Sequence, residues 1–323
     1  MALGSPSASR FNLSRGSAIV GYGRLLDWLR SGGVLVDGIE GLVRGERAVG
    51  DLDGLLVEID RLKGWLDAFR PLPRDVVVEL KQRWDVRFTY HSNAIEGNTL
   101  TQSETELVLS RGITIGGKTL QEHLEVVGHK DAIDYIEQLA SAEMPIGEWE
   151  IRTIHRLILR AIAPEEAGRY RQLDVRAAGT EFHYPAHYLV DGLMAEFVAW
   201  MAIARGQLHP VQYAAEAHLR FVSIHPFRDG NGRSGRLLMN LLLLRAGLPI
   251  VVISQGDRLA YINGLVAAQQ GGADEALVTL VANGVKASLV EILAVVATAG
   301  TSRGRGEGFY GELMLFLEDH RLS

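Results

Sequence analysis

The sequence predicts a mainly α-helical protein with one short β-hairpin. Apolar residues recur at helical spacing in most segments of the 323-residue chain, and only residues 174–184 combine alternation with a central glycine, as a hairpin requires. No repeat of fixed period is present, which disfavours a solenoid. We expect an N-terminal helical region over residues 1–74, a large helical domain over 75–299, and a flexible connector with a short C-terminal helix over 300–323.

Composition excludes several classes of protein. The formal net charge of -6 argues against a main role in binding nucleic acid or an anionic membrane. The absence of cysteine excludes disulfides, a thiolate nucleophile and cysteine-ligated metals. Residues 1–23 lack the apolar core of a secretory signal, and the apolar run 237–253 is interrupted by polar residues, glycine and proline, which indicates a buried helix and a turn. We therefore expect a soluble, cytoplasmic protein, and we also expect its source to be bacterial.

Two helices are predicted in the first hundred residues. An apolar stripe over residues 51–69 indicates a helix with one buried face and Asp51 as its N-cap, ended by the prolines that follow. That face either packs against the rest of the chain or forms a homodimer contact, and the sequence leaves both open; it includes Trp65, Leu66 and Phe69. A second helix begins near Asp75 and runs towards Asn98.

The remaining elements are helical apart from the hairpin. Two capping boxes, Thr101 with Glu104 and Thr119 with Glu122, begin two helices, and the first of these ends near Gly112. Further helical stripes are found near 148–162, 189–204, 210–224, 233–246, 258–269 and 274–298.

The strongest chemical signal is the segment 224–236, Ile-His-Pro-Phe-Arg-Asp-Gly-Asn-Gly-Arg-Ser-Gly-Arg. Gly230 and Gly232 permit backbone angles in which consecutive N–H groups turn towards one anion. The next helix begins near Gly232, so the positive end of its dipole adds to the same field. The segment therefore predicts a phosphate site between two helices.

Side chains of this segment add reactive groups. Arg233 and Arg236 share a helix face and can grip one polyphosphate. Asp229 is a hard ligand that suits Mg²⁺ carried by a nucleotide, and His225 is the group that exchanges a proton near neutral pH. A solvated loop would be the ordinary interpretation, but so many of these groups within twelve positions make a reactive site the better one.

The same segment matches, at every defined position, the HPFx(D/E)GNGRxxR signature of Fic-domain proteins, which the chain resembles over about residues 89–298. The resemblance implies a helical Fic fold that transfers AMP from ATP to a Ser, Thr or Tyr hydroxyl of a target protein, itself included. It implies that His225 takes the hydroxyl proton and that Asp229 holds Mg²⁺, while Phe227 anchors the loop in the core. The groups that would hold ATP phosphates are Gly230, Asn231, Gly232, Arg233 and Arg236.

Residues 92–98 match a second, inhibitory motif of Fic proteins, (S/T)xxxE(G/N). Ser92 and Glu96 are one helical turn apart, and Gly97 lets the helix end. If Glu96 meets Arg236, its carboxylate takes the place of an ATP γ-phosphate, and the enzyme is inhibited by its own chain. Alternatively, Glu96 aligns a water molecule that removes AMP from a modified protein, and the sequence does not decide between the two.

The predicted hairpin over residues 175–184 lies where Fic proteins place a flap beside the active site. An exposed strand there would pair with an extended target segment and present its hydroxyl to His225. An ordinary surface hairpin is the alternative interpretation.

Two rival functions come from other features. Residues 112–119 fit the Walker A pattern GxxxxGK(S/T) and suggest a P-loop NTPase, but a helix precedes them where a P-loop needs a strand. We interpret them as a connection between helices, capped by Thr119. A nonenzymatic, nucleotide-responsive module is the other rival, and intact His225 and Asp229 disfavour it.

Overall fold

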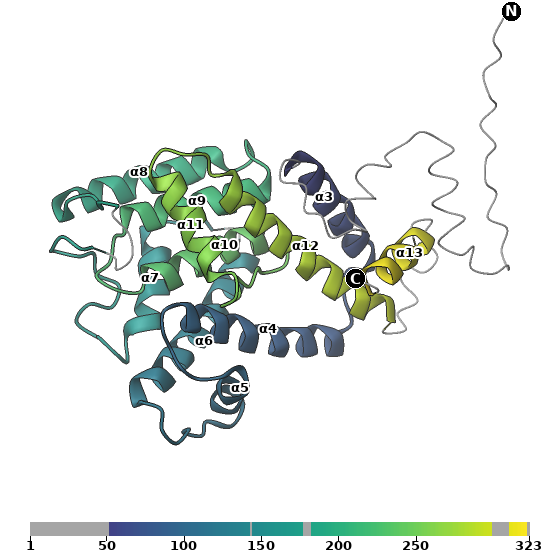
Figure 1. The fold of residues 1–323 in the computed structure, drawn as a ribbon, viewed down its shortest axis with the longest axis horizontal. Helices are drawn as coiled ribbons and strands as arrows, with labels where there is room; N and C mark the ends of the chain where they lie inside the picture. Colours follow the sequence, from purple (N-terminus) through teal and green to yellow (C-terminus); the bar gives the residue numbers. More distant parts are fainter. Residues whose placement is uncertain (1–51, 143, 177–181, 299–309, 322–323) are drawn as a thin grey trace, which may run out of the picture. The chain divides into compact units, whose positions relative to one another are not determined.

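The computed structural model describes residues 52–142, 144–176, 182–298 and 310–321 (Figure 1). These residues contain no strand and belong to one compact unit, so the mainly α-helical fold class is confirmed. Their elements are α3 (Leu52–Phe69), α4 (Arg74–Ile95), α5 (Gln102–Arg111), α6 (Leu120–Ser141), α7 (Glu148–Leu159), the 3₁₀ turn η1 (His187–Leu189), α8 (Val190–Ala204), α9 (Pro210–Ile224), α10 (Asn231–Arg245), α11 (Arg258–Gln269), α12 (Glu275–Thr298) and α13 (Tyr310–Arg321).

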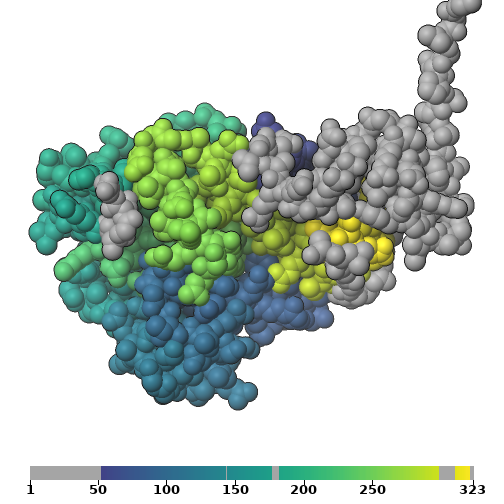
Figure 2. Space-filling model, viewed as in Figure 1, coloured from purple at the N-terminus to yellow at the C-terminus, as the bar shows by residue number. Residues whose placement is uncertain are grey.

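Helix α4 lies against α5 and α6, and its C-terminal end carries residue 96. A charge network joins α4 to α6: the ammonium groups of Lys81 and Lys130 lie 3.1 and 3.3 Å from a carboxylate oxygen of the buried Asp85. In Figure 2 the surface of α4–α6 (blue) adjoins that of the chain after α10 (light green). The helix that precedes residue 96 is thus joined to a neighbouring helix by these charged groups.

The capping boxes predicted for α5 and α6 are both present. Gly112 adopts φ 63° where α5 ends, and Thr119 caps α6, so residues 112–119 connect two helices. The ammonium group of Lys118 donates to the hydroxyl of Thr99 at 3.1 Å. The P-loop interpretation fails because a helix, and not a strand, precedes the glycines.

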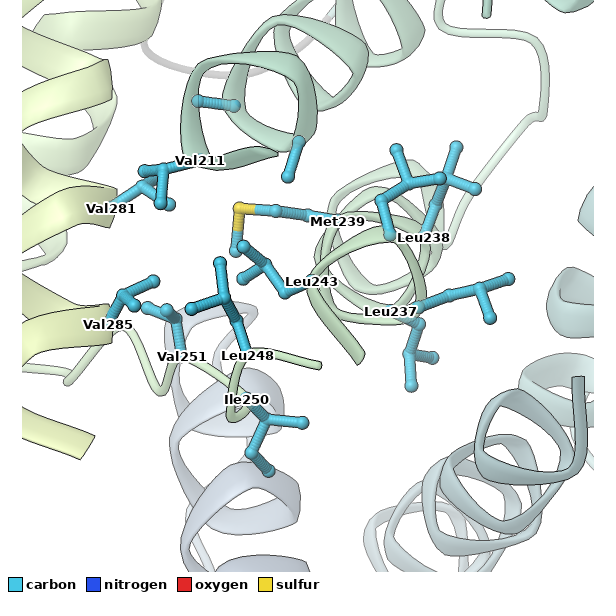
Figure 3. Close-up of a cluster of buried hydrophobic side chains, with 14 of the residues drawn as sticks. Val211, Leu237, Leu238, Met239, Leu243, Leu248, Ile250, Val251, Val281 and Val285 are labelled. Carbon is cyan, nitrogen blue, oxygen red and sulfur yellow. The ribbon is translucent and has the colours of Figure 1, made fainter. Parts of the chain in front are cut away.

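Helix α10 is the centre of the hydrophobic core. It contacts α9, α6, α7 and α4, and Figure 3 shows its leucines and Met239 packed among side chains of α9, α12 and the chain that follows α10. Its buried apolar residues are Leu237, Leu238, Met239, Leu241, Leu242 and Leu243. A helix that is apolar on all sides is a core helix, so the chemical motif at its N-terminus rests on a rigid element.

Helix α12 is long and apolar enough to cross a membrane by composition. Here it is a core helix: it packs against α3 and α9, with Val281, Val285 and Leu289 fully buried. The apolar face of α3 packs within the chain, and the ring of Trp65 makes an edge contact with Phe316 of α13 at 5.8 Å. Of the two alternatives for this face, packing against the rest of the chain is therefore found.

Several predictions fall at the edges of the described residues. The proposed N-cap Asp51 and most of the glycine-rich connector lie outside them. The domain boundaries after residues 74 and 299 stay predictions.

The hairpin predicted over residues 174–184 is not present as strands in residues 174–176 and 182–184, and its turn lies outside the described residues. Side chains hold its two flanks instead. The guanidinium of Arg171 donates to the carbonyls of Leu173 and Pro185, and the carboxylate of Asp174 accepts from the backbone N–H of His187 at 2.8 Å. These contacts replace a strand ladder in the described flanks.

Candidate active site

His225 follows the last residue of α9 in a left-handed conformation, φ 52°, the only non-glycine residue with a positive φ in the described ranges. Its backbone N–H still donates to the carbonyl of Phe221 at 3.0 Å, which turns the chain sharply out of the helix. Such a conformation is unfavourable for a residue with a side chain unless neighbours hold it. Arg171 does so, since its Nε donates to the carbonyl of His225 at 2.8 Å.

The hydrogen bond and the surroundings of His225 determine its tautomer and its charge. Its Nδ1 lies 3.2 Å from the carbonyl of Val222; a carbonyl only accepts, so Nδ1 carries the proton and Nε2 keeps its lone pair. The ring of Tyr184 stacks on it with 4.0 Å between ring centres. Burial lowers the pKa of His225, and the charge of Arg171 lowers this pKa further. The ring is therefore neutral at pH 7.

The loop after His225 is closed by Asn231. The side-chain oxygen of Asn231 accepts from the N–H of Phe227 at 2.9 Å, and its amide nitrogen donates to the carbonyl of Phe227 at 2.8 Å. Both polar groups of this side chain are thus used inside the loop, so the structure assigns Asn231 to loop closure. A contact between Asn231 and a phosphate stays a prediction, and the backbone N–H of this residue, at the start of α10, is the group that would make it.

The two glycines of the loop have different reasons to be glycine. Gly230 has φ 76° and is the N-cap of α10, as predicted. Gly232 lies inside α10 without a positive φ, so the expectation of unusual backbone angles was wrong there. A Cβ on Gly232 would collide with the carboxylate of Glu96, and its role is to leave room for an anion close to the helix.

Phe227 is fully buried, which confirms its role as a core anchor, and it stacks on a histidine that the sequence analysis missed. The ring of His155, from α7, lies parallel to that of Phe227 with 3.6 Å between centres. Its Nδ1 accepts from the N–H of Gly168 at 2.9 Å, and its Nε2 donates to the carbonyl of Asp229 at 3.0 Å. Burial lowers the pKa of His155 to about 4, so the ring is neutral at pH 7. Its hydrogen bonds then hold the loop in place.

Arg233 is a buried cation without enough partners. Its side chain is 4% exposed, and Nε and Nη1 have no hydrogen-bond partner among the described residues. The nearest carboxylates are loosely placed, Asp229 at 3.4 Å and Glu125 at 3.9 Å. Because a buried guanidinium with unused donors is unfavourable, the site is suited to an anionic ligand.

Asp229 is the residue suited to a metal. Its side chain is 69% exposed, and one carboxylate oxygen accepts from the N–H of Gly230 at 2.6 Å. In the described residues no three His, Cys, Asp or Glu side chains gather in a way that could hold a metal ion. A single carboxylate fits Mg²⁺ that brings phosphate oxygens and water as its other ligands.

Arg236 makes the contact that the second motif predicts. Its Nη2 donates to a carboxylate oxygen of Glu96 at 2.7 Å and to the carbonyl of Ser92 at 2.8 Å, and its Nε donates to the Ser92 hydroxyl at 3.1 Å. Burial raises the pKa of Glu96, but the charge and hydrogen bond of Arg236 outweigh this and hold that pKa below its usual value. The carboxylate is charged at neutral pH.

The end of α4 is held by partners far along the chain. The helix ends at Ile95 and Gly97 takes φ 101°, as the motif predicts. Arg258 of α11 donates from Nε to the carbonyl of Ile95 at 3.1 Å. Three residues earlier, the N–H of Gln255 donates to Nδ1 of His91 at 3.2 Å. Neither contact has a sequence signal, because Gln255 and Arg258 belong to no motif and 163 positions separate Arg258 from Ile95.

Comparison with known families and curated proteins finds one family. The family model described as Fic/DOC family matches residues 145–243. The protein adenylyltransferase Fic of Drosophila grimshawi is 40% identical over 183 residues, which is 56% of this chain and 38% of the relative. That of Drosophila virilis is 40% identical over 56% of this chain and 37% of its own length. The match thus spans little more than a third of these curated relatives.

Solved structures match over more of the chain. A Fic domain containing signaling protein from Bacteroides thetaiotaomicron is 31% identical with a TM-score of 0.68, covering 77% of this chain and 97% of that protein. Fic-1 from C. elegans is 29% identical with a TM-score of 0.68, covering 87% of this chain and 80% of that one.

Proposed function

Because the chain belongs to the Fic/DOC family, we propose that it is a protein adenylyltransferase that transfers AMP from ATP to a Ser, Thr or Tyr hydroxyl of a target protein. One observation carries the proposal: the imidazole of His225 is neutral with its proton on Nδ1, and it adjoins a loop and helix N-terminus where Arg233 is buried with donors that no described residue uses. The curated relatives named as protein adenylyltransferases support this activity.

The geometry suits transfer by positioning and charge stabilisation. Nε2 of His225 would take the proton of the target hydroxyl as its oxygen attacks the α-phosphorus of ATP, and pyrophosphate would leave. The backbone N–H groups at the start of α10, with Arg233, would hold the phosphate oxygens. Asp229 would hold Mg²⁺, which neutralises phosphate charge.

We further propose that Glu96 inhibits this activity within the same chain. The carboxylate of Glu96 accepts a hydrogen bond from the guanidinium of Arg236 at 2.7 Å. It also lies so close to Gly232 that a Cβ at that position would collide with it. A triphosphate reaching the same guanidinium would meet a negative charge already in place. Release of the end of α4 would then be the step that permits productive ATP binding.

Removal of AMP is the second candidate, and one observation favours it. Glu96 keeps 39% of its side chain exposed, and only one of its carboxylate oxygens has a hydrogen bond to another described residue. Because the pKa of Glu96 is lowered, this carboxylate would orient a water molecule rather than store its proton. The same residue would then inhibit transfer and promote hydrolysis.

Labelled ATP tests both candidates. Purified protein with Mg²⁺ and ATP labelled at the α-phosphate should show weak incorporation, self-modification included, and Glu96→Gly should increase it. The double variant with His225→Ala should lose it. If proteins modified by the Glu96→Gly variant lose AMP when wild-type protein is added, and keep it when Glu96→Gln is added, hydrolysis is the main activity.

The partner and the location follow from the same proposal. Mass spectrometry of a lysate treated with the Glu96→Gly variant and ATP would identify the target protein and the added group. We place the protein in the cytoplasm, since its cysteine-free sequence suits a reducing compartment and ATP is available there. A homodimer stays a prediction that light scattering can test.

A further inference from the structure

We propose that Arg171 is a positioning residue for the AMP transfer proposed above: its buried guanidinium fixes the backbone of His225 and ties it to both flanks of the segment before α8. The inference rests on the proposed function for its catalytic consequence. The contacts that carry it do not depend on the family.

The guanidinium of Arg171 donates hydrogen bonds to backbone carbonyls around His225. Its side chain is 1% exposed. Nε donates to His225 at 2.8 Å, Nη1 to Leu173 at 3.1 Å, and Nη2 to Pro185. Its own backbone N–H donates to the carbonyl of Pro226 at 2.9 Å. One side chain thus fastens three separate stretches of backbone.

These contacts use the shape of the guanidinium more than its charge. The nearest carboxylate, that of Asp174, lies 3.8 Å away and already accepts hydrogen bonds from His187. A planar fork with donors on three nitrogens can reach three carbonyls, which an ammonium group cannot do with the same geometry. A lysine at position 171 would keep the charge and lose the fork.

The reaction needs this fastening for two reasons. The backbone of His225 has an unfavourable left-handed conformation, which persists only if its surroundings fix it. Arg171 fixes it by donating to the carbonyl of His225 itself. Arg171 also holds Pro185, the neighbour of Tyr184, whose ring covers the imidazole at 4.0 Å. A base misplaced by about 1 Å can lower a rate by about 100-fold.

The chain offers a matched control at the other end of α10. The guanidinium of Arg245 also donates to backbone carbonyls, to Leu139 at 3.0 Å and to Met144 at 2.6 Å. Arg245 lies at the last position of α10, whereas the reactive segment precedes and begins that helix. Arg245→Lys should cost stability of the same kind while leaving the site intact.

The experiment uses the Glu96→Gly protein as its parent and adds Arg171→Lys, Arg171→Met or Arg245→Lys. We expect both Arg171 variants to lower kcat by at least about tenfold, with the KM for ATP within about twofold of the parent. Arg245→Lys should lower Tm and keep kcat. Equal kcat in the parent and Arg171→Lys proteins would overturn the proposal.

A pH measurement separates positioning from simple loss of stability. The charged or titratable groups around His225 are Arg171, Asp229, Glu96 and the stacked Tyr184, and the parent lacks the third. Arg171→Met removes a positive charge that lowers the pKa of His225, so kcat should begin to fall at a higher pH on acidification. Arg171→Lys keeps the charge, so it should lower the maximum kcat without moving the pH at which kcat falls.

NMR of ¹⁵N-labelled histidine keeps the proposal testable even without activity. The parent should show His225 with its proton on Nδ1, and Arg171→Lys should show mixed tautomers. If the parent transfers no AMP but the tautomers change, the proposed function fails and the positioning role stands. If the His225 signals are the same in the parent and both Arg171 variants, the positioning role fails.

Discussion

The loop that we propose to be catalytic and the Glu96 carboxylate that we propose to be inhibitory meet near the start of α10 but are held in different ways. The loop is fastened by neutral and charged donors to backbone carbonyls, from His155 and Arg171, and both donors are buried. In the described part of the chain, Glu96 is held by one charged pair, and its side chain remains 39% exposed. The backbone at the end of α4 is also fixed, by Arg236 at Ser92 and by Arg258 at Ile95, but the ion pair of the Glu96 side chain can be exchanged for a pair with another anion. The difference indicates a rigid loop around His225 and a detachable inhibitor, the side chain of Glu96.

The largest expected effect comes from the rigid side of this comparison. His225→Ala in the Glu96→Gly protein should lower AMP transfer by about 10²- to 10⁴-fold, the usual contribution of a general base. ATP binding measured by calorimetry should persist, because the phosphate-holding groups lie on α10. A variant that still transferred AMP at the parent rate would show that another group takes the proton.

Removal of the Glu96 side chain should increase AMP transfer. Glu96→Gly should raise AMP incorporation by roughly 5- to 150-fold, the range of coupling between two sites on one protein. Glu96→Gln is the matched variant, since it keeps the shape and loses the charge, and should give a smaller gain. Equal rates in wild-type and both variants would remove the inhibitory role.

Much of this comparison could be predicted from the sequence. Helical spacing and capping boxes gave the helices to within a few residues, because those signals are local. The contact between Glu96 and Arg236 was expected from two motifs with 140 positions between them. The sequence did not reveal why Gly232 is a glycine, since that depends on a close approach by another helix.

The supports of the loop could not be predicted because their partners are backbone groups. His155 and Arg171 bind carbonyls 74 and 54 positions away, and any residue type offers a carbonyl. Asn231 looked like a phosphate ligand, yet its side chain closes the loop. Phe227 and Asn231 support the loop from within the motif and could be found there, whereas His155 and Arg171 lie outside it and could not.

Acid should weaken the loop before it weakens the inhibitory pair. Burial lowers the pKa of His155 to about 4, below the ordinary value of about 6.5. Between these values the unfolded chain binds a proton at His155 that the folded chain does not bind. His155 alone should therefore lower the free energy of unfolding by up to about 1.4 kcal/mol for each pH unit of acidification, and His129, whose pKa burial lowers well below its usual value, adds to this slope. The pKa of Glu96 is lowered from 4.5, so its stabilising contribution is lost only below that pH.

Urea unfolding at about pH 7 and about pH 5 measures this slope. His155→Gln should flatten it, because the amide can replace the donor to Asp229 without titrating. His218, whose pKa burial also lowers to about 4, should keep a similar share of the slope in that variant. An unchanged slope would mean that His155 is protonated in the folded protein and that the loop is held differently.

The smallest expected effect concerns the bond that holds the last turn of α4. Arg258 donates to the carbonyl of Ile95 at 3.1 Å, and a hydrogen bond of this kind contributes about 1 kcal/mol. Arg258→Met should therefore let Glu96 leave Arg236 more often and raise AMP incorporation by about 2- to 5-fold in the otherwise wild-type chain.

Arg83→Met is the matched control, since Arg83 forms an exposed pair with Glu79 on α4 and its loss should not change AMP incorporation. In the Glu96→Gly background the gain from Arg258→Met should disappear, because there is no carboxylate left to release. A gain that persisted there would show that Arg258 acts on the catalytic loop, and the division between a rigid loop and a detachable inhibitor would no longer hold.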